Sequence, residues 1–196
     1  DLEFGKETVD SYEIGVKTNI TRAFQFNASA FHTTVHGYQN LQFAGSFFVV
    51  NNFDKLVSKG IELESIIRPA SNLNIGLNYT LLDTNVTDAS AGSDNGMPLT
   101  NSPRHVVTGG VTWTPQITTG IRGLVHVDMR YNSEVNIPSN NPNPTTGRTA
   151  LFNPGYALLG ARVGLQTDDG KKSLEFFVEN LTNQYYHITG FAVPEQ

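Results

Sequence analysis

Apolar residues recur at every second position in several segments of the sequence, most clearly in Ile121–Asn132. The odd positions of this segment are Ile121, Gly123, Val125, Val127, Met129 and Tyr131, and its even positions are Arg122, Leu124, His126, Asp128, Arg130 and Asn132. All of its charges therefore belong to one face of an extended chain, because successive side chains of a strand point to opposite sides. This pattern is typical of a transmembrane β-barrel wall, with hydrocarbon outside and a polar interior.

Composition restricts the alternatives. The 196 residues are 38% hydrophobic with a mean hydropathy of −0.25, and no run approaches the roughly 18 apolar residues of a membrane helix. If the chain crosses a membrane, it must therefore cross it with β-strands. The sequence has no cysteine, which excludes disulfides and thiolate metal sites. A net charge of −5 argues against nucleic acid as a partner.

The alternation predicts an all-β fold of eight antiparallel strands. Their expected bounds are Thr8–Ile20, Phe24–Gly37, Val57–Arg68, Leu73–Leu82, His105–Thr114, Ile121–Asn132, Gly155–Gln166 and Ser173–Leu181. In the second strand Phe24, Phe26 and Ala28 share one face whereas Phe31 falls on the other, so we expect a bulge near Ala30.

Short and long connections alternate along the chain. The long ones are expected to be loops at Tyr38–Leu56, Asp83–Arg104 and Ser133–Pro154. Outer-membrane barrels have short turns on the periplasmic side and long loops outside, so both ends of this chain should lie on the long-loop side. A complete small barrel would have them in the periplasm. We therefore expect residues 1–196 to be a block of strands from a larger barrel, with no leader peptide at its start.

Charged side chains at inward positions are the candidate ligand-binding or lumen-lining residues. They are Glu62, Glu64, Arg122, His126, Asp128, Arg130, Arg162, Glu175 and Glu179. Arg122, His126 and Arg130 could hold an anionic ligand, but an ion-paired, solvated interior explains them more simply. The paired glutamates could in principle serve acid–base chemistry, yet their spacing only repeats the inward parity of a strand. We expect no catalytic residue, cofactor or metal site, and therefore no enzyme.

Several segments resemble the C-terminal part of the β-barrel of TonB-dependent outer-membrane receptors. Ser11–Lys17 resembles the family's "YE-G-K" strand, and Phe26–Leu41 the strand that follows it. Asn51-Asn52 with Lys59–Glu64 is similar to its "N…G-E-E" segment, Pro103–His105 to its "P-x-H" strand start, and Phe176–Tyr186 to its "v-NL-d-Y" motif. The family's plug domain, earlier strands and aromatic-ended closing strand have no counterpart in this sequence.

The resemblance implies a segment of a transmembrane barrel of about 22 strands in the bacterial outer membrane. It also implies energy-coupled uptake of a scarce ligand, a ferric siderophore first, with cobalamin or a carbohydrate as alternatives. The implied partners are outer-membrane lipid, the extracellular ligand and the TonB energy-coupling complex, which would act through the plug. Two other interpretations are a passive outer-membrane channel and a soluble β-sandwich that binds a ligand.

Overall fold

The computed structural model describes residues 5–43, 48–87, 96–137 and 151–190, and within these ranges the chain forms strands and no helix. The strands are β1 (Thr8–Asn19), β2 (Phe24–Phe43), β3 (Phe48–Ala70), β4 (Leu73–Thr87), β5 (His105–Trp113), β6 (Gln116–Thr118), β7 (Ile121–Asn132), β8 (Val135–Asn136), β9 (Phe152–Asn153), β10 (Tyr156–Thr167) and β11 (Ser173–Val178). In these ranges no helix is long and apolar enough to cross a membrane.

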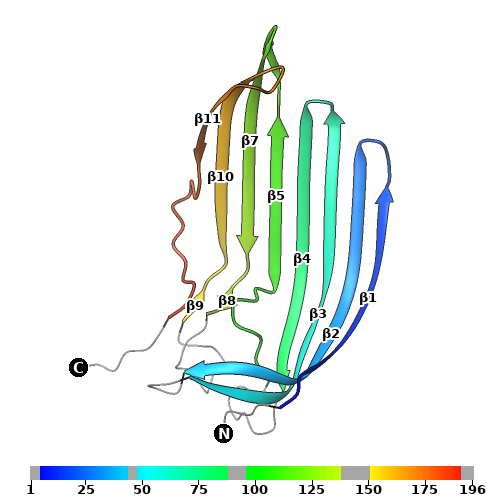
Figure 1. Cartoon of the computed structure of the whole chain (residues 1–196), viewed down its shortest axis with the longest axis vertical. Coiled ribbons are helices and arrows are strands. Elements are labelled where there is room, and N and C mark those ends of the chain that lie inside the picture. Colours follow the sequence, from blue (N-terminus) through cyan, green and yellow to red (C-terminus); the bar gives the residue numbers. More distant parts are fainter. Residues whose placement is uncertain (1–4, 44–47, 88–95, 138–150, 191–196) are drawn as a thin grey trace, which may run out of the picture.

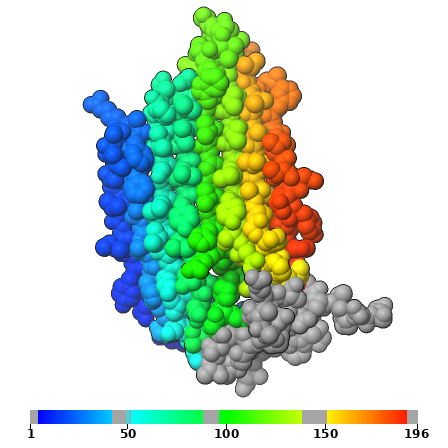
Figure 2. Space-filling model, turned by 180° about the vertical axis from the view of Figure 1, so that it is seen from behind, coloured from blue at the N-terminus to red at the C-terminus, as the bar shows by residue number. Residues whose placement is uncertain are grey.

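The long strands form one antiparallel sheet in chain order, β1-β2-β3-β4-β5-β7-β10-β11, with β6 attached to β7. Figure 1 shows them side by side as a curved wall, and Figure 2 shows the same order from blue to red. The described strands form a single layer, apart from the two-residue strands β8 and β9. Within the described residues no second sheet packs on its face, whereas the β-sandwich interpretation requires one. Among the described strands, β1 and β11 are unpaired edges and the barrel is not closed.

The strand register gives the sheet one apolar and one polar face, as the alternation predicts. In β7, Val125 and Val127 lie opposite Val163 and Ala161 of β10, and Val127 also lies opposite Val111 of β5. These side chains share the apolar face, where Val127 is 45% and Val163 is 51% exposed. The apolar residues of β7 therefore do not form a core within the described part of the chain.

The predicted bulge near Ala30 is wrong. Ala30 lies directly opposite Ile14 of β1 and Ile61 of β3, and the register is unbroken on both sides. Phe31 instead belongs to the polar face, opposite Gly60. A Cβ on Gly60 would lie 2.7 Å from the Phe31 ring, so the glycine leaves room for this inward aromatic side chain. The change of face is thus accommodated by a small neighbour.

The predicted loop Tyr38–Leu56 is also wrong, because β2 and β3 continue through it as one ladder up to the pair Phe43 and Phe48. The ladder bends at Gly37, whose φ is +67°. In Figure 1 the end of this hairpin turns across the lower end of the sheet. Asn52 fastens the bend, since its side chain donates to the Gly37 carbonyl at 2.7 Å and accepts from the Gly5 amide at 2.9 Å.

The other two long connections are partly described. β4 extends to Thr87, beyond its predicted end at Leu82, and the loop expected at Asp83–Arg104 thereby loses its first residues to a strand. In Ser133–Pro154, the short strands β8 and β9 pair with each other. Residues 88–95 and 138–150 of these connections lie outside the described residues. A small core of Phe53, Leu56 and Val86 lies at this end of the sheet, with Leu99 packed against it.

Tight turns join the strands at the opposite end, as predicted. The turn between β10 and β11 closes with a hydrogen bond from the Gly170 amide to the Thr167 carbonyl at 2.9 Å. The Thr167 hydroxyl donates to Asp169 at 2.6 Å, and the Lys171 amide donates to it at 3.1 Å. These hydrogen bonds, the one from Thr167 first, lower the pKa of the Asp169 carboxyl.

Candidate functional site

The candidate residues predicted from the sequence lie on the polar face or at its border. Glu62 and Glu64 come from β3, four residues come from β7, and Arg162 and Glu175 come from β10 and β11. Glu179 follows β11 directly and lines the same hollow as Arg162. Two strands, β4 and β5, separate β3 from β7, so the structure divides the candidates into two groups.

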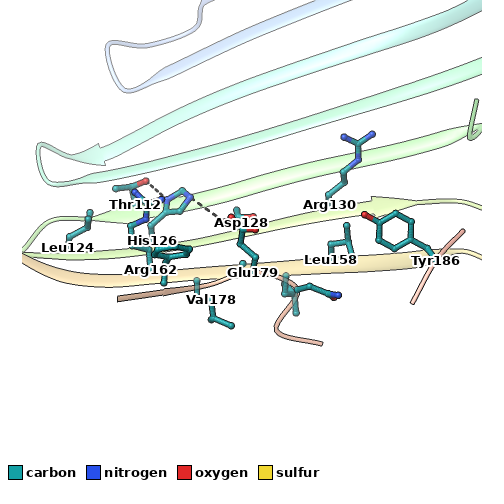
Figure 3. A pocket seen from close by; sticks show the side chains of 15 residues that line it. Thr112, Leu124, His126, Asp128, Arg130, Leu158, Arg162, Val178, Glu179 and Tyr186 are labelled. Carbon is teal, nitrogen blue, oxygen red and sulfur yellow. Dashed lines mark hydrogen bonds and ion pairs between the residues drawn. The ribbon is translucent and has the colours of Figure 1, made fainter. Parts of the chain in front are cut away.

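The centre of the larger group is a short chain of polar contacts. The Thr112 hydroxyl and His126 Nδ1 are 2.8 Å apart, and His126 Nε2 is 3.6 Å from Asp128 Oδ1. Figure 3 shows both contacts, with Arg130 on the same strand farther along. Thr112 lies opposite His126 in the register between β5 and β7, which fixes this geometry. Sequence reasoning missed Thr112, although the parity of β5 would have placed it on the polar face.

Arg162 contacts two neighbours on β11. Its guanidinium lies 3.3 Å from the Glu175 carboxylate and 5.9 Å from the centre of the Phe177 ring. The Arg162 and Glu175 side chains are 51% and 30% exposed, so solvent screens this ion pair. This ion pair therefore contributes about 1 kcal/mol or less to stability.

Arg122 belongs to a different contact set, at the tight-turn end of the sheet. Asp168 accepts from the Arg122 Nε at 3.0 Å, from the Gly120 amide at 3.1 Å and from the Gln116 side chain at 3.2 Å. This carboxylate therefore ties the β10–β11 turn to the β6–β7 turn. The sequence predicts a short connection between Gln166 and Ser173, but it does not identify Asp168 as the partner of Arg122.

The smaller group is organised around Glu64. The Asn27 side chain donates to Glu64 at 3.0 Å, and the Asn27 Oδ1 is buried without a hydrogen-bond partner among the described residues.

Farther along the polar face, Arg130 donates to the Asn132 side chain at 3.2 Å, and Asn132 donates to the Tyr156 hydroxyl at 2.9 Å. The polar face thus carries chains of hydrogen bonds that run across neighbouring strands.

A hollow of about 670 Å³ lies over the larger group. Its border includes His126, Asp128, Arg130, Arg162 and Tyr186, five of the residues labelled in Figure 3. The described residues contain no cluster of side chains suited to hold a metal ion. The arrangement can donate hydrogen bonds from its two guanidinium groups and accept them at the Asp128 and Glu179 carboxylates, so it suits a polar surface of mixed charge.

Comparison with known proteins decides the family. The family model described as "TonB dependent receptor-like, beta-barrel" matches residues 3–181. The chain belongs to this family. Its members are outer-membrane receptors and transporters rather than enzymes, and the chain is a protein of the bacterial outer membrane. No curated protein sequence matches the chain.

Solved structures share the fold at low sequence identity. The ferric yersiniabactin uptake receptor FyuA of Yersinia pestis is 19% identical, with a TM-score of 0.79 over 97% of this chain and 27% of its own. The ferric preacinetobactin receptor BauA of Acinetobacter baumannii is 20% identical, with a TM-score of 0.69 over 91% of this chain and 26% of its own. The copper transporter OprC is 14% identical, with a TM-score of 0.70 over 94% of this chain and 27% of its own. The chain thus spans about a quarter of these TonB-dependent receptor structures.

Proposed function

We propose that residues 1–196 are part of the barrel domain of an outer-membrane receptor that imports a scarce ligand by an energy-coupled route. The family match over residues 3–181 carries this proposal. The alternation of tight turns with long connections supports it, because outer-membrane barrels place the long connections outside the cell. In this orientation the bent β2–β3 hairpin faces the medium and the turn at Gly170 faces the periplasm.

The height of the apolar face supports contact with lipid. In β7 it runs from Ile121 to Tyr131, ten residue steps along one strand. At about 3.4 Å per residue this is about 34 Å, and a strand tilt of about 40° reduces it to about 26 Å. The hydrophobic band of outer-membrane barrels is about 25 Å tall. Tyr79 and Tyr131, at the long-connection end, suit the interfacial ring of aromatic residues.

The polar face would then line the lumen. We propose that the nine candidate residues, Glu62, Glu64, Arg122, His126, Asp128, Arg130, Arg162, Glu175 and Glu179, form this lining. In an intact receptor they would face a plug region through which the TonB complex acts. A packed lumen of this kind explains the ion pairs and amides that the described part of the wall carries.

We propose a ferric siderophore as the imported ligand. Similar structures include the uptake receptor for ferric yersiniabactin, the receptor for ferric preacinetobactin and a siderophore receptor of Acinetobacter baumannii. Cobalamin and carbohydrates are the alternatives that the resemblance to the family implies, and the copper transporter OprC adds a metal ion to them. Arg130 and Arg162 border the hollow and can donate hydrogen bonds to the anionic chelates that bind Fe³⁺, while Asp128 and Glu179 on the same border balance their charge.

The test is uptake by cells of the source bacterium that lack or carry the full-length receptor. We expect radiolabelled iron delivered as a ferric siderophore to enter only cells with the receptor, and a protonophore to abolish that entry. Labelled cobalamin, copper and oligosaccharides are assayed in parallel. Receptor-dependent uptake that persists with the protonophore would establish a passive channel instead. Uptake of one of the other ligands alone would replace the siderophore.

A further inference from the structure

A second hollow lies at the tight-turn end of the sheet. Its volume is about 370 Å³, which is within the range of about 300–1,000 Å³ that is typical of small-molecule sites. The end of β3, the turn between β3 and β4, and β5 surround it, and we call it the rim hollow. Its polar lining residues are Arg68, Ser71, Asn72, Asn74, Thr112 and Thr114.

A β-bulge sets the position of Arg68. The register between β3 and β4 shifts between Ile67 and Ala70, so two residues of β3, Arg68 and Pro69, stand against the single residue Asn74 of β4. Bulges are frequent at the rims of barrels, where they re-aim a side chain. The backbone amide of Arg68 donates to a carbonyl of the turn between β1 and β2 at 2.7 Å, which fixes the bulged backbone in place.

The rim hollow contains a cation that no carboxylate of the described residues balances. Within that part of the chain the Arg68 guanidinium has no ion pair and no hydrogen bond. The other polar groups of the lining are hydroxyls and amides, and none of the described lining residues is acidic. The larger hollow differs, because Asp128 and Glu179 lie on its border. A guanidinium beside hydroxyl and amide donors forms strong hydrogen bonds to a carboxylate, so the rim hollow favours an anionic group.

The rim hollow adjoins the larger hollow. Thr112 lines both of them, and Asn74, Thr112 and His126 form one row across β4, β5 and β7. Figure 3 shows Thr112 at the opposite end of the larger hollow from Tyr186. A small molecule that moves along the polar face toward the tight-turn end therefore passes from the larger hollow directly to the rim hollow. In the proposed orientation this end faces the periplasm.

We propose that the rim hollow binds a carboxylate group of a small molecule that passes along the lumen. The inference rests on the proposed function, because the imported ligand is the molecule whose route ends at this rim. Its carrying observation is the Arg68 guanidinium, which the bulge sets among hydroxyl and amide groups with no acidic residue in the described lining. The rim hollow thus gives an anionic ligand a second binding site, between the larger hollow and the periplasm.

The experiment measures how fast phenylglyoxal modifies arginine side chains of the full-length receptor in mild detergent, with citrate as the carboxylate probe. Peptide mass spectrometry quantifies each arginine separately. We expect about 10 mM citrate to slow the modification of Arg68 about tenfold, as a dissociation constant of about 1 mM requires. Arg22, in the neighbouring turn, does not line the hollow and should react at an unchanged rate. Sodium chloride at the same ionic strength should protect neither arginine.

Two matched substitutions on β4 test where the citrate binds. Asn74→Asp places a carboxylate inside the rim hollow, so it should remove the effect of citrate on Arg68 by repulsion between like charges. Asn78→Asp adds the same charge farther along the same strand, outside the hollow, and should leave the effect of citrate unchanged. Heat-modifiable migration in gels shows that each variant is folded.

A modification rate of Arg68 that does not change with citrate would overturn the proposal. Slow modification of Arg68 before citrate is added would also overturn it, because a group of the receptor itself would then fill the hollow. Protection by citrate that survives Asn74→Asp would overturn it by placing the citrate elsewhere. Receptor-dependent uptake is measured separately on wild-type cells, so a failed citrate test with normal energy-coupled uptake leaves the proposed function standing.

Discussion

Asp128 and Gly160 lie directly opposite each other on β7 and β10, and the Asp128 carboxylate occupies the space above the glycine. A Cβ on residue 160 would be 2.6 Å from its Oδ1. The absence of a side chain at this position therefore lets Asp128 lie beside His126.

We predict that Gly160→Ala moves the carboxylate away from His126. Because the displaced group is the end of a flexible side chain, the stability of the receptor should change by about 1 kcal/mol or less. Ring ¹⁵N chemical shifts of His126 in the full-length receptor measure the effect. Gly76→Ala is the matched control, since a Cβ there meets no atom within 4 Å. An unchanged His126 ring in Gly160→Ala would contradict the prediction.

Asp168 should matter more for stability than its neighbour. We predict that Asp168→Ala lowers the free energy of unfolding by about 1 kcal/mol, because Arg122 and the Gly120 amide lose their acceptor but remain accessible to water. Asp169→Ala removes only bonds within its own turn and should cost less. Thermal unfolding in detergent compares the two. A larger loss in Asp169→Ala would show that the link between the two turns is unimportant.

Gly37 is expected to tolerate no side chain. Its φ of +67° and a Cβ position 2.6 Å from the Lys6 carbonyl oxygen combine strain with a backbone clash. We predict that Gly37→Ala destabilises the hairpin by about 2–4 kcal/mol, seen as faster hydrogen exchange at the Gln39 amide. Gly120→Ala has a similar φ of +84° but open space, so it should cost only about 1 kcal/mol. If the two variants lost the same stability, the positive φ alone, and not the clash with the Lys6 carbonyl oxygen, would account for the destabilisation in Gly37→Ala.

The hydroxyl of Tyr38 should titrate above its ordinary pKa of 10.0, because burial raises that pKa and the nearby Glu7 carboxylate raises it further. Because the pKa of Tyr38 is higher in the folded protein than in the unfolded chain, protonation of its hydroxyl favours folding. This contribution to stability is complete below pH 10.0, the ordinary pKa, and is lost as the pH rises through the pKa of the folded protein. We predict that Glu7→Gln lowers the pKa of Tyr38 but leaves it raised. Tyrosine ring NMR, assigned with Tyr38→Phe, measures it. A pKa that returns to normal would make Glu7 the main cause.

The sequence predicted the fold well in strands that have one apolar and one polar face. In β7 and β10 all of the charged side chains lie on the polar face, although Leu124 and Leu158 also lie there, and the predicted parity is that of the observed register. The prediction failed at Phe31 and at Tyr38–Leu56. Phe31 breaks the alternation, and only the identity of its cross-strand neighbour, Gly60, explains why no bulge is needed.

The hairpin beyond Gly37 could not be predicted from alternation. It extends past the apolar band, so its two faces no longer differ in polarity and the signal that marks a strand disappears. Hydrogen-bond partners on neighbouring strands could not be predicted from alternation either. Parity indicates that Thr112 and His126 share a face, but only the register between β5 and β7 sets them 2.8 Å apart.

The unbroken ladder between β2 and β3 has a mechanical consequence. The backbone pairs run without a shift in register from Phe24 opposite Ile67 to Phe43 opposite Phe48, across the bend at Gly37. The described arms of the hairpin and the wall below them are therefore one continuous pair of strands, so a displacement of the Phe43–Phe48 pair would be transmitted to the wall through paired backbone.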